Sequence, residues 1–242
     1  MRSDSRTPEQ MRPIKVTPHF TKHAAGSVLI EIGSTVVLCN VSVDHSLPPF
    51  LRGVKNQGWV TAEYAMLPAS THTRSRRERN KISGRSSEIQ RLIGRCLRGV
   101  VDLKKIPEMT FHVDCDVLQA DGGTRTTSIT GACIALKLAV QKLIASGKLK
   151  ENPVKYSVAA VSCGIVEDEV LVDLDYNEDS NAQTDMNVVM TDSGGLLEVQ
   201  GTAEKDPFTP EQLNTILSMA KDALDPVFSL QEDALEGNVI EA

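Results

Sequence analysis

One long segment of the chain is apolar on nearly every side. From about Thr127 to Ala145, apolar residues recur around the whole circumference of a helix, and Gly147 is a helix stop signal just beyond it. The apolar side chains are those of Ile129, Ala132, Cys133, Leu136, Ala139, Val140 and Leu143. A helix that is hydrophobic all round has to be buried on all sides. We therefore predict a central helix that other layers of the fold cover.

Shorter segments before and after this helix alternate between polar and apolar residues, which is typical of half-buried strands. The predicted strands cover residues 28–33, 36–43, 58–67, 109–119, 156–166, 170–176, 186–191 and 196–200. Short turns join three pairs of them into hairpins. This order of strands and helices predicts an α+β fold with helices packed on sheets. The repeated Thr-Ala-Glu at 61–63 and 202–204 would fit two strand-then-helix halves, but it is too short to establish a duplication.

Two further helices and three irregular segments complete the predicted fold. Apolar residues from 89 to 100 follow the spacing of an amphipathic helix, with Ser86 or Ser87 as its cap. The last helix begins at Thr209, with proline next and Gln212 completing a capping box. The irregular segments are an extended arm over 1–15, a long basic loop over 69–84 and an acidic tail over 231–242 that frays.

Length and composition limit the class of protein. A chain of 242 residues fits one large domain or two small ones fused on a shared core, and we predict a single domain over 1–242. No apolar run approaches the roughly 20 residues of a membrane span, and residues 1–15 contain no apolar stretch of signal-peptide type. The five cysteines stand singly in apolar runs, which indicates buried side chains rather than disulfides or zinc ligands. We expect a cytoplasmic protein without a membrane partner.

Charge is distributed unevenly along the chain. The net charge is −6, yet residues 74–98 include nine basic and two acidic residues, whereas residues 165–242 include nineteen acidic residues and two lysines. A basic segment on an acidic body suggests a site for a polyanion, although a charge run is often only a solvated surface. The basic stretch contains Arg74, Arg76, Arg77, Arg79, Lys81 and Arg85. It contains no aromatic residue, so it suits backbone phosphates rather than base stacking.

A glycine-rich turn precedes the central helix. In Asp121-Gly122-Gly123-Thr124-Arg125-Thr126-Thr127, the glycines let the backbone approach a ligand, and the helix start offers free N–H groups. The threonine hydroxyls and the Arg125 guanidinium add donors for phosphate. The turn is not a P-loop, which has lysine after its second glycine. Taken alone, the segment is equally consistent with an ordinary glycine turn before a capped helix.

Two carboxylates flank a polar stretch between predicted strands. Asp179 and Asp185 are of the residue type that binds Mg²⁺ on loops. A fully extended chain would hold them about 20 Å apart, so they can share one ion only if the chain bends between them. A solvated acidic loop is the alternative. His19 and His23 lie four residues apart, but no cysteine or third histidine completes a metal site, so we expect structural roles for both.

Eight longer motifs occur in order along nearly the whole chain. They are Arg-Thr-Pro-Glu-Gln-Met-Arg-Pro at 6–13, Gly-Trp-Val-Thr-Ala-Glu-Tyr at 58–64, Thr-His-Thr-Arg at 71–74, Ser-Gly-Arg at 83–85, Glu-Ile-Gln-Arg-Leu-Ile-Gly-Arg at 88–95, Ala-Asp-Gly-Gly-Thr-Arg-Thr at 120–126, Asp-Ser-x-x-x-Thr-Asp-Met-Asn-Val-Val-Met at 179–190 and Glu-Val-Gln-Gly-Thr-Ala-Glu at 198–204. Motifs of this length in this order are highly specific. In them the chain resembles the bacterial RNase PH family, the phosphorolytic 3′ exoribonucleases of transfer-RNA maturation.

The resemblance implies a fold, an assembly and a reaction. The fold would be a duplicated βα core of mixed sheets packed on helices, assembled into a hexameric ring as a trimer of dimers. The reaction would be reversible, phosphate-dependent removal of 3′ nucleotides from transfer-RNA precursors as nucleoside diphosphates, with ribosomal RNA as a candidate second substrate. The cofactor would be Mg²⁺ or Mn²⁺, and inorganic phosphate would be the co-substrate.

The resemblance also implies which residues form the site. Phosphate would be held by Arg85, Gly123, Thr124 and Arg125. The catalytic carboxylates, which would also bind the metal ion, are Asp179 and Asp185. Transfer RNA would be gripped by Arg74 and Arg77, with help from Arg76 and Arg79.

Three other functions stay open on the sequence alone. The first is a non-catalytic ring subunit of the exosome kind. The presence of four predicted site residues argues against it, namely Asp179, Asp185, Arg85 and Arg125. The second is an archaeal-type catalytic exosome subunit, which would need a different partner chain. The third is a hydrolytic two-metal nuclease, which normally needs more converging carboxylates than the sequence offers. Polynucleotide phosphorylase is excluded by length, because it needs two such cores and RNA-binding appendages.

Overall fold

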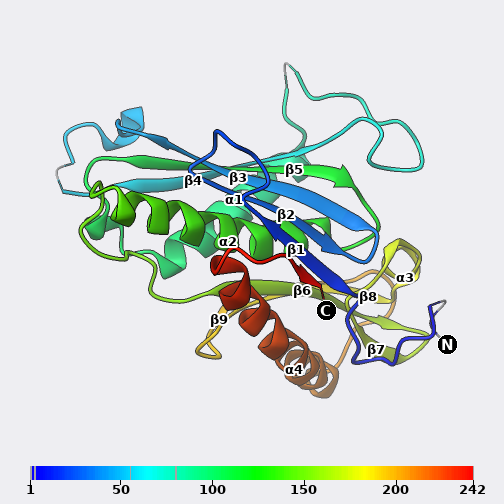
Figure 1. The fold of residues 1–242 in the computed structure, drawn as a ribbon. Coiled ribbons are helices and arrows are strands. Elements are labelled where there is room, and N and C mark those ends of the chain that lie inside the picture. Colours follow the sequence, from blue (N-terminus) through cyan, green and yellow to red (C-terminus); the bar gives the residue numbers. More distant parts are fainter. Residues whose placement is uncertain (1, 3, 55, 80, 242) are drawn as a thin grey trace.

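A computed structural model describes residues 2, 4–54, 56–79 and 81–241. Residues 1, 3, 55, 80 and 242, which belong to the predicted arm, the segment before the third strand, the basic loop and the tail, lie outside the described residues. The described chain forms two β-sheets with helices packed on them, as Figure 1 shows. The predicted α+β architecture is therefore confirmed.

The first sheet has six strands and is mixed. Its strands, in spatial order, are β10 (Ile240–Glu241), β1 (Ile14–Pro18), β2 (Gly26–Ile32), β3 (Thr35–Asp44), β5 (Thr110–Gln119) and β4 (Trp59–Met66). Every neighbouring pair is antiparallel except β4 and β5, which run parallel because α1 connects them. Short 3-10 turns at Pro49–Leu51 and Leu103–Lys105 lie in the connections.

The second sheet has four strands and is antiparallel throughout, so only the first sheet is mixed. Its strands, in spatial order, are β7 (Glu169–Val172), β6 (Val158–Val166), β8 (Thr184–Thr191) and β9 (Leu196–Ala203). The predicted hairpins β6–β7 and β8–β9 are both present. The strand predicted to extend to residue 176 ends at Val172, because Asp173 has a φ of +55°, which no strand residue adopts.

The central helix is α2 (Thr124–Ala145), which packs on β2, β3 and β5 of the first sheet and on β6 of the second. By length and composition α2 could cross a membrane, but 72% of its most apolar window is buried in the fold, as in a core helix. The prediction of a covered central helix is confirmed. The helix begins at Thr124, three residues earlier than predicted, because the polar residues of its first turns bond back to the helix backbone and join it.

The other two long helices are α1 (Gly84–Val100) and α4 (Pro210–Leu235). The cap of α1 is Ser83 and not Ser86 or Ser87, since the Ser83 hydroxyl accepts from the Ser86 amide at 3.1 Å. This earlier start places Arg85 in the first turn of α1. The cap of α4 is as predicted, with a complete capping box and proline at the first helical position.

The predicted fraying of the tail after Leu230 is wrong. Helix α4 continues to Leu235, and Ile240 and Glu241 then form β10 on the edge of the first sheet, opposite Val16 and Lys15 of β1. The Lys15 ammonium and the Glu241 carboxylate lie 2.5 Å apart. A strand of two residues is too short to show alternation, so the sequence pattern could not reveal it.

Candidate active site

The turn before α2 requires glycine at two positions. Gly122 has a φ of +74° and Gly123, the residue before α2, has a φ of +65°. A Cβ on Gly122 would lie 2.4 Å from the carbonyl oxygen of Leu174, which leaves no space for a side chain. In the part of the chain that the structure describes, no side chain caps the N-terminus of α2. Its first amide N–H groups therefore remain available to an anion.

Neighbouring segments hold this turn in place. The Thr35 hydroxyl donates to the carbonyl oxygen of Gly122 at 2.6 Å and accepts from the amide of Asp121 at 2.9 Å. The Arg12 guanidinium donates to the carbonyl oxygen of Asp121. The turn is thus fixed by β3 and by the N-terminal arm, and it does not have to be ordered by a ligand.

A cavity of about 460 Å³ opens at this helix end. Its lining residues are Met66, Thr71, His72, Thr73, Arg85, Ala120, Gly122, Gly123, Thr124, Tyr176 and Asp179. Four predicted site residues, Arg85, Gly123, Thr124 and Asp179, therefore meet at one cavity, although they come from three separate parts of the chain. Arg125 and Asp185 do not line the cavity.

Asp179 and Asp185 do not lie on the polar loop that the sequence predicts. Asp179 is on a short helix, α3 (Tyr176–Asn181), and Asp185 is the second residue of β8. A capping box between Asp175 and Glu178 starts α3. Because the chain reverses after α3, both carboxylates come close enough for the charge of Asp179 to affect the pKa of Asp185. The bend that a shared ion would require is present.

Electrostatics link these carboxylates to the predicted phosphate site. Burial, followed by the charge of Asp179, raises the pKa of half-buried Asp185 to about 6, although Arg125 and Arg85 act against the rise. The Asp179 side chain is more exposed, yet partial desolvation raises its pKa too, again opposed by Arg85 and Arg125. Two partly desolvated carboxylates, of which Asp179 raises the pKa of Asp185, form a site that favours a cation.

The donor set fits a hydrated divalent cation. Among the described residues there is no group of three or more His, Cys, Asp or Glu side chains that could hold a metal ion. Asp179 and Asp185 are two hard oxygen donors, and Mg²⁺ commonly takes one or two carboxylates and completes its shell with water and substrate phosphate oxygens. His19 and His23 are exposed and distant in sequence from both carboxylates.

Arg125 is held by side chains from two other elements. Its Nη1 donates to Oε1 of Gln200 on β9 at 3.0 Å and lies 3.7 Å from the Glu88 carboxylate on α1. These contacts come from side chains that a substrate could displace, because neither Gln200 nor Glu88 is fully buried. Arg125 thus stands next to the carboxylate pair and has a charge that reaches both members.

The four arginines predicted to bind RNA are all exposed on the loop between β4 and α1, which extends from the body of the fold (Figure 1). The start of this loop, residues 71–73, lines the site cavity. Further along it, the charge of Arg77 lowers the pKa of Asp116 on β5, which burial raises. The loop therefore begins at the cavity and at Arg77 comes close to Asp116 on β5 of the first sheet.

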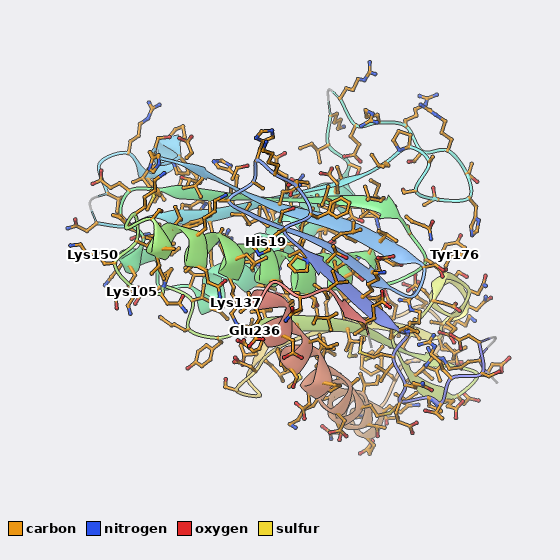
Figure 2. The ribbon with its side chains drawn as sticks, viewed as in Figure 1. His19, Lys105, Lys137, Lys150, Tyr176 and Glu236 are labelled. Atoms are coloured by element: carbon orange, nitrogen blue, oxygen red, sulfur yellow. The ribbon has the colours of Figure 1, made fainter. Side chains whose placement is uncertain are left out.

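The sequence reasoning missed three aromatic residues at this site. His72 and Tyr176 meet edge to face at the cavity, with ring centroids 5.9 Å apart. Tyr176 is 51% exposed and projects at the end of the molecule opposite Lys150 (Figure 2). Tyr64 lies behind the cavity and donates to the Thr124 hydroxyl. No periodicity marks them, because each approaches the site from a different element. Tyr64 and His72 do fall inside the motifs at 58–64 and 71–74, which were the one signal for them.

The N-terminal arm, predicted only as extended, anchors the site from behind. Arg2 donates to both oxygens of Glu178 at 2.7 and 2.8 Å, and Glu178 is next to Asp179 on α3. Arg12 and Asp173 form a second buried ion pair at 2.8 Å. Burial would lower the pKa of Arg12, but the hydrogen bond and charge of Asp173 outweigh it and raise that pKa.

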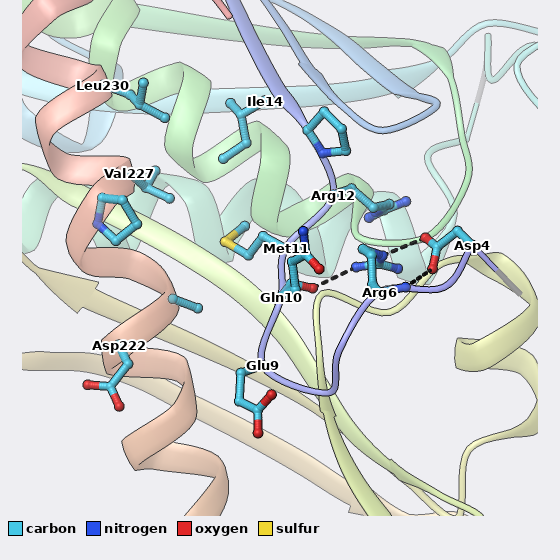
Figure 3. Close-up of a pocket in the computed structure, with 13 residues that line it drawn as sticks. Asp4, Arg6, Glu9, Gln10, Met11, Arg12, Ile14, Asp222, Val227 and Leu230 are labelled. Carbon is cyan, nitrogen blue, oxygen red and sulfur yellow. Dashed lines mark hydrogen bonds and ion pairs between the residues drawn. The ribbon is translucent and has the colours of Figure 1, made fainter. Parts of the chain in front are cut away.

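Arg6 completes this buried network. Its Nη1 lies 3.5 Å from the Asp173 carboxylate. Figure 3 shows that Arg6 also pairs with Asp4 and donates to the carbonyl oxygen of Gln10. The arm therefore ties α3, which carries Asp179, to the turn before α2. Residues about 160 to 176 positions apart in the chain meet here, which is beyond the reach of local sequence patterns.

A helix end with free amides, two arginines and a carboxylate pair is a site of the kind that handles phosphate esters. The chain matches the 3′ exoribonuclease family in both of its domains, domain 1 over residues 10–141 and domain 2 over residues 156–223. It therefore belongs to this family, which takes its name from RNase PH, and the part of the resemblance that places the chain in the RNase PH family is confirmed.

Solved structures share the fold. The chain is similar to rice (Oryza sativa) Rrp46, with a TM-score of 0.79 and 22% identity over 97% of this chain and 100% of that one. It is also similar to the Archaeoglobus fulgidus exosome with RNA bound to the active site, with a TM-score of 0.77 and 21% identity over 96% of this chain and 92% of that one. It is similar as well to an archaeal exosome core, with a TM-score of 0.76 and 21% identity over 96% of this chain and 91% of that one. These likenesses establish the RNase PH-like fold.

Proposed function

We propose that this chain is a phosphorolytic 3′-to-5′ exoribonuclease of the bacterial RNase PH kind. The reaction is RNA(n+1) plus phosphate giving RNA(n) plus a nucleoside diphosphate, and it is reversible. One observation carries the proposal, namely that the free helix end with Arg85 and the carboxylates Asp179 and Asp185 lie within each other's electrostatic field. A nucleophilic phosphate and a scissile phosphodiester could therefore be held side by side.

Phosphate is already anionic at neutral pH, so the reaction needs no strong general base. Arg85, Arg125 and the first amides of α2 bind the attacking phosphate and align it, and alignment with charge neutralisation supplies most of the catalysis. Asp179 and Asp185 would hold Mg²⁺ or Mn²⁺, which supplies positive charge beside the scissile phosphate. Burial and the charge of Asp179 raise the pKa of Asp185 to about 6, but as a ligand of the cation this carboxyl would be ionised, so the proton for the leaving 3′ oxygen would come from the hydrogen phosphate that is consumed.

The proposed substrates are transfer-RNA precursors, and ribosomal RNA 3′ ends are a second candidate. RNA as the ligand is supported by the exosome of the same fold that has RNA bound to its active site. The exposed arginines of the basic loop would grip the backbone of a folded RNA without reading its sequence. We place this activity in the cytoplasm, without a membrane partner.

The assembly proposed is a homohexameric ring, a trimer of dimers. The related exosome structures raise two alternatives, an inactive ring subunit and a subunit that needs a different partner chain. An inactive subunit has no need of Asp179, Asp185, Arg85 and Arg125 in one electrostatic field, which favours a catalytic chain. The mass of the purified particle separates a ring of six identical chains from a hetero-ring.

Phosphate dependence tests the proposal. The chain is incubated with a 3′-extended transfer RNA and Mg²⁺, with and without phosphate, and the released nucleotide is identified by chromatography. Nucleoside diphosphates should appear only with phosphate, and nucleoside diphosphates supplied without phosphate should extend RNA 3′ ends. Release of nucleoside monophosphates in phosphate-free buffer would contradict phosphorolysis and favour a hydrolytic nuclease.

The basic loop gives a separate prediction about substrate choice. Arg74→Ala with Arg77→Ala should weaken processing of a transfer-RNA precursor while largely sparing phosphorolysis of a short single strand. Each lost phosphate contact should also reduce the salt dependence of transfer-RNA binding, lowering the slope by about one. Rates on both substrates and binding at several salt concentrations measure this. Equal losses on both substrates would place these arginines in catalysis or assembly.

A further inference from the structure

The hydroxyl groups in the first two turns of α2 are mostly used within the helix. Thr126 and Thr127 both donate to the carbonyl oxygen of Gly123, at 2.9 and 2.8 Å. Ser128 and Thr130 donate to carbonyl oxygens one turn back, at 2.7 and 3.0 Å. A hydroxyl has one hydrogen, so these four side chains have none left for a ligand.

Thr124 is the exception in this segment. Its Oγ1 accepts a hydrogen bond from the Tyr64 hydroxyl at 2.9 Å. Among the described residues, no acceptor is present for the hydrogen of the Thr124 hydroxyl itself. Because Thr124 lines the cavity with Arg85 and Asp179, this hydrogen is free to be donated to an anion there.

Tyr64 is linked to the cavity by its hydrogen bond to Thr124. It lies on β4 opposite Cys115 of β5, is 2% exposed, and does not line the cavity. Burial raises the pKa of Tyr64, and the Thr124 hydrogen bond and the charges of Arg85 and Arg125 only partly oppose the rise. The phenol therefore keeps its proton at neutral pH, and as the more acidic hydroxyl it is the donor to Thr124.

We propose that Tyr64 is a positioning residue for the phosphate site, where its hydrogen bond to Thr124 aims the Thr124 hydroxyl at the anion. The proposal rests on the phosphate-binding role given to Thr124 in the proposed function. The site then has a directed neutral donor in addition to Arg85 and the amides of α2. A neutral donor held from behind adds geometric selection for a tetrahedral oxyanion, which the charges alone would not provide.

The test removes the Tyr64 hydroxyl and nothing else. Tyr64→Phe keeps the buried ring, so the core packing is retained. Binding of inorganic phosphate to the full chain is measured by isothermal titration calorimetry, and phosphorolysis is then measured with phosphate varied at saturating RNA. We expect about tenfold weaker phosphate binding and about tenfold higher KM for phosphate, the effect of weakening one hydrogen bond to a charged ligand. The kcat and the KM for RNA should stay close to wild type.

A double-mutant cycle identifies the route of the effect. Thr124→Val should weaken phosphate binding at least as much as Tyr64→Phe does. The double variant should be no worse than Thr124→Val, because Tyr64 has no hydroxyl left to position once Thr124 is replaced. Tyr156→Phe is the matched control, since it removes the hydroxyl of a tyrosine that is 45% exposed, and it should leave both measurements unchanged.

The outcomes separate this role from the reaction itself. Wild-type phosphate affinity in Tyr64→Phe, whether or not the variant melts earlier, would overturn the role of Tyr64, and so would summed losses in the double variant. Tyr64-dependent phosphate binding together with release of nucleoside monophosphates would sustain the role of Tyr64 and overturn phosphorolysis. A wild-type chain that does not bind phosphate would overturn both.

Discussion

Asp185→Asn is expected to slow phosphorolysis by on the order of 10²-fold or more, because it removes a charge that would hold a catalytic cation beside the scissile phosphate. Asp179→Asn should slow phosphorolysis to a similar extent, because it removes the second carboxylate that would hold the same cation. Asparagine keeps the shape of aspartate, so the loss can be assigned to charge. Single-turnover phosphorolysis of a 3′-extended RNA at saturating phosphate measures both variants.

The same substitution should not weaken the fold. Burial and the charge of Asp179 raise the pKa of Asp185 from the ordinary value of 3.8 to about 6. Because the folded state binds the proton of this carboxyl more tightly than the unfolded state does, the carboxyl contributes stability below about pH 4. That stability is lost as the pH rises through about 6 and the buried carboxyl ionises. At pH 8 the wild-type protein has lost this contribution, whereas asparagine has no charge to desolvate. Asp185→Asn should therefore melt at the wild-type temperature or above it.

Controls separate chemistry from assembly. Asp206→Asn removes an exposed carboxylate in the segment after β9 and should leave the rate unchanged. Raised Mg²⁺ or Mn²⁺ should partly rescue Asp179→Asn and Asp185→Asn if weakened metal binding causes the loss. Near-normal turnover in either variant would remove that carboxylate from the mechanism. Lost activity with an altered particle mass would make its role structural.

Asp173→Asn should be the most destabilising single change in the arm network. The Asp173 carboxylate accepts from Arg12 and Arg6, and all three side chains are buried. Asparagine tolerates the φ of +55° at this position, so the backbone is not strained and only the charge is lost. Breaking a buried ion pair and leaving its partner uncompensated typically costs about 3–5 kcal/mol. In a chain of this size that lowers the melting temperature by on the order of 10 °C.

An exposed pair of the same type provides the comparison. Glu241→Gln breaks the surface pair with Lys15, in which the Glu241 and Lys15 side chains are 67% and 42% exposed, and should leave the melting temperature close to that of the wild type because solvent screens the pair. Thermal melting of both variants at one protein concentration measures the difference, because assembly makes the melting temperature depend on concentration. Equal melting temperatures for Asp173→Asn and wild type would mean that the arm does not stabilise the fold.

Much of the fold follows from patterns that act over a few residues. The strands from Gly26 to Asp44 alternate, α2 is apolar all round, and the start of α4 has its capping box, and in each case burial or a local hydrogen bond decides the structure. The two-residue β10 and the early start of α1 were missed, because a short edge strand and a choice among nearby serines leave no periodic signal.

The site depends on contacts between distant residues, which the sequence pattern could not supply. Whether Asp179 and Asp185 come together depends on the short helix α3 and the bend after it. The Tyr64–Thr124 hydrogen bond joins residues 60 positions apart, and the Arg2–Glu178 pair joins residues 176 apart. The motifs indicated candidate site residues, and the structure shows the arm that binds α3 and the tyrosine that bonds to Thr124.

The most direct test of the central claim follows the oxygen atoms of the reaction. The chain is incubated with RNA, Mg²⁺ and phosphate labelled with ¹⁸O on all its oxygens, in unlabelled water, and the released nucleotides are analysed by mass spectrometry. If phosphate is the nucleophile, the nucleoside diphosphates will contain the label in their β-phosphate and in the bridging oxygen. Unlabelled nucleoside monophosphates, which take up ¹⁸O only when the water is labelled, would show attack by water and contradict the account.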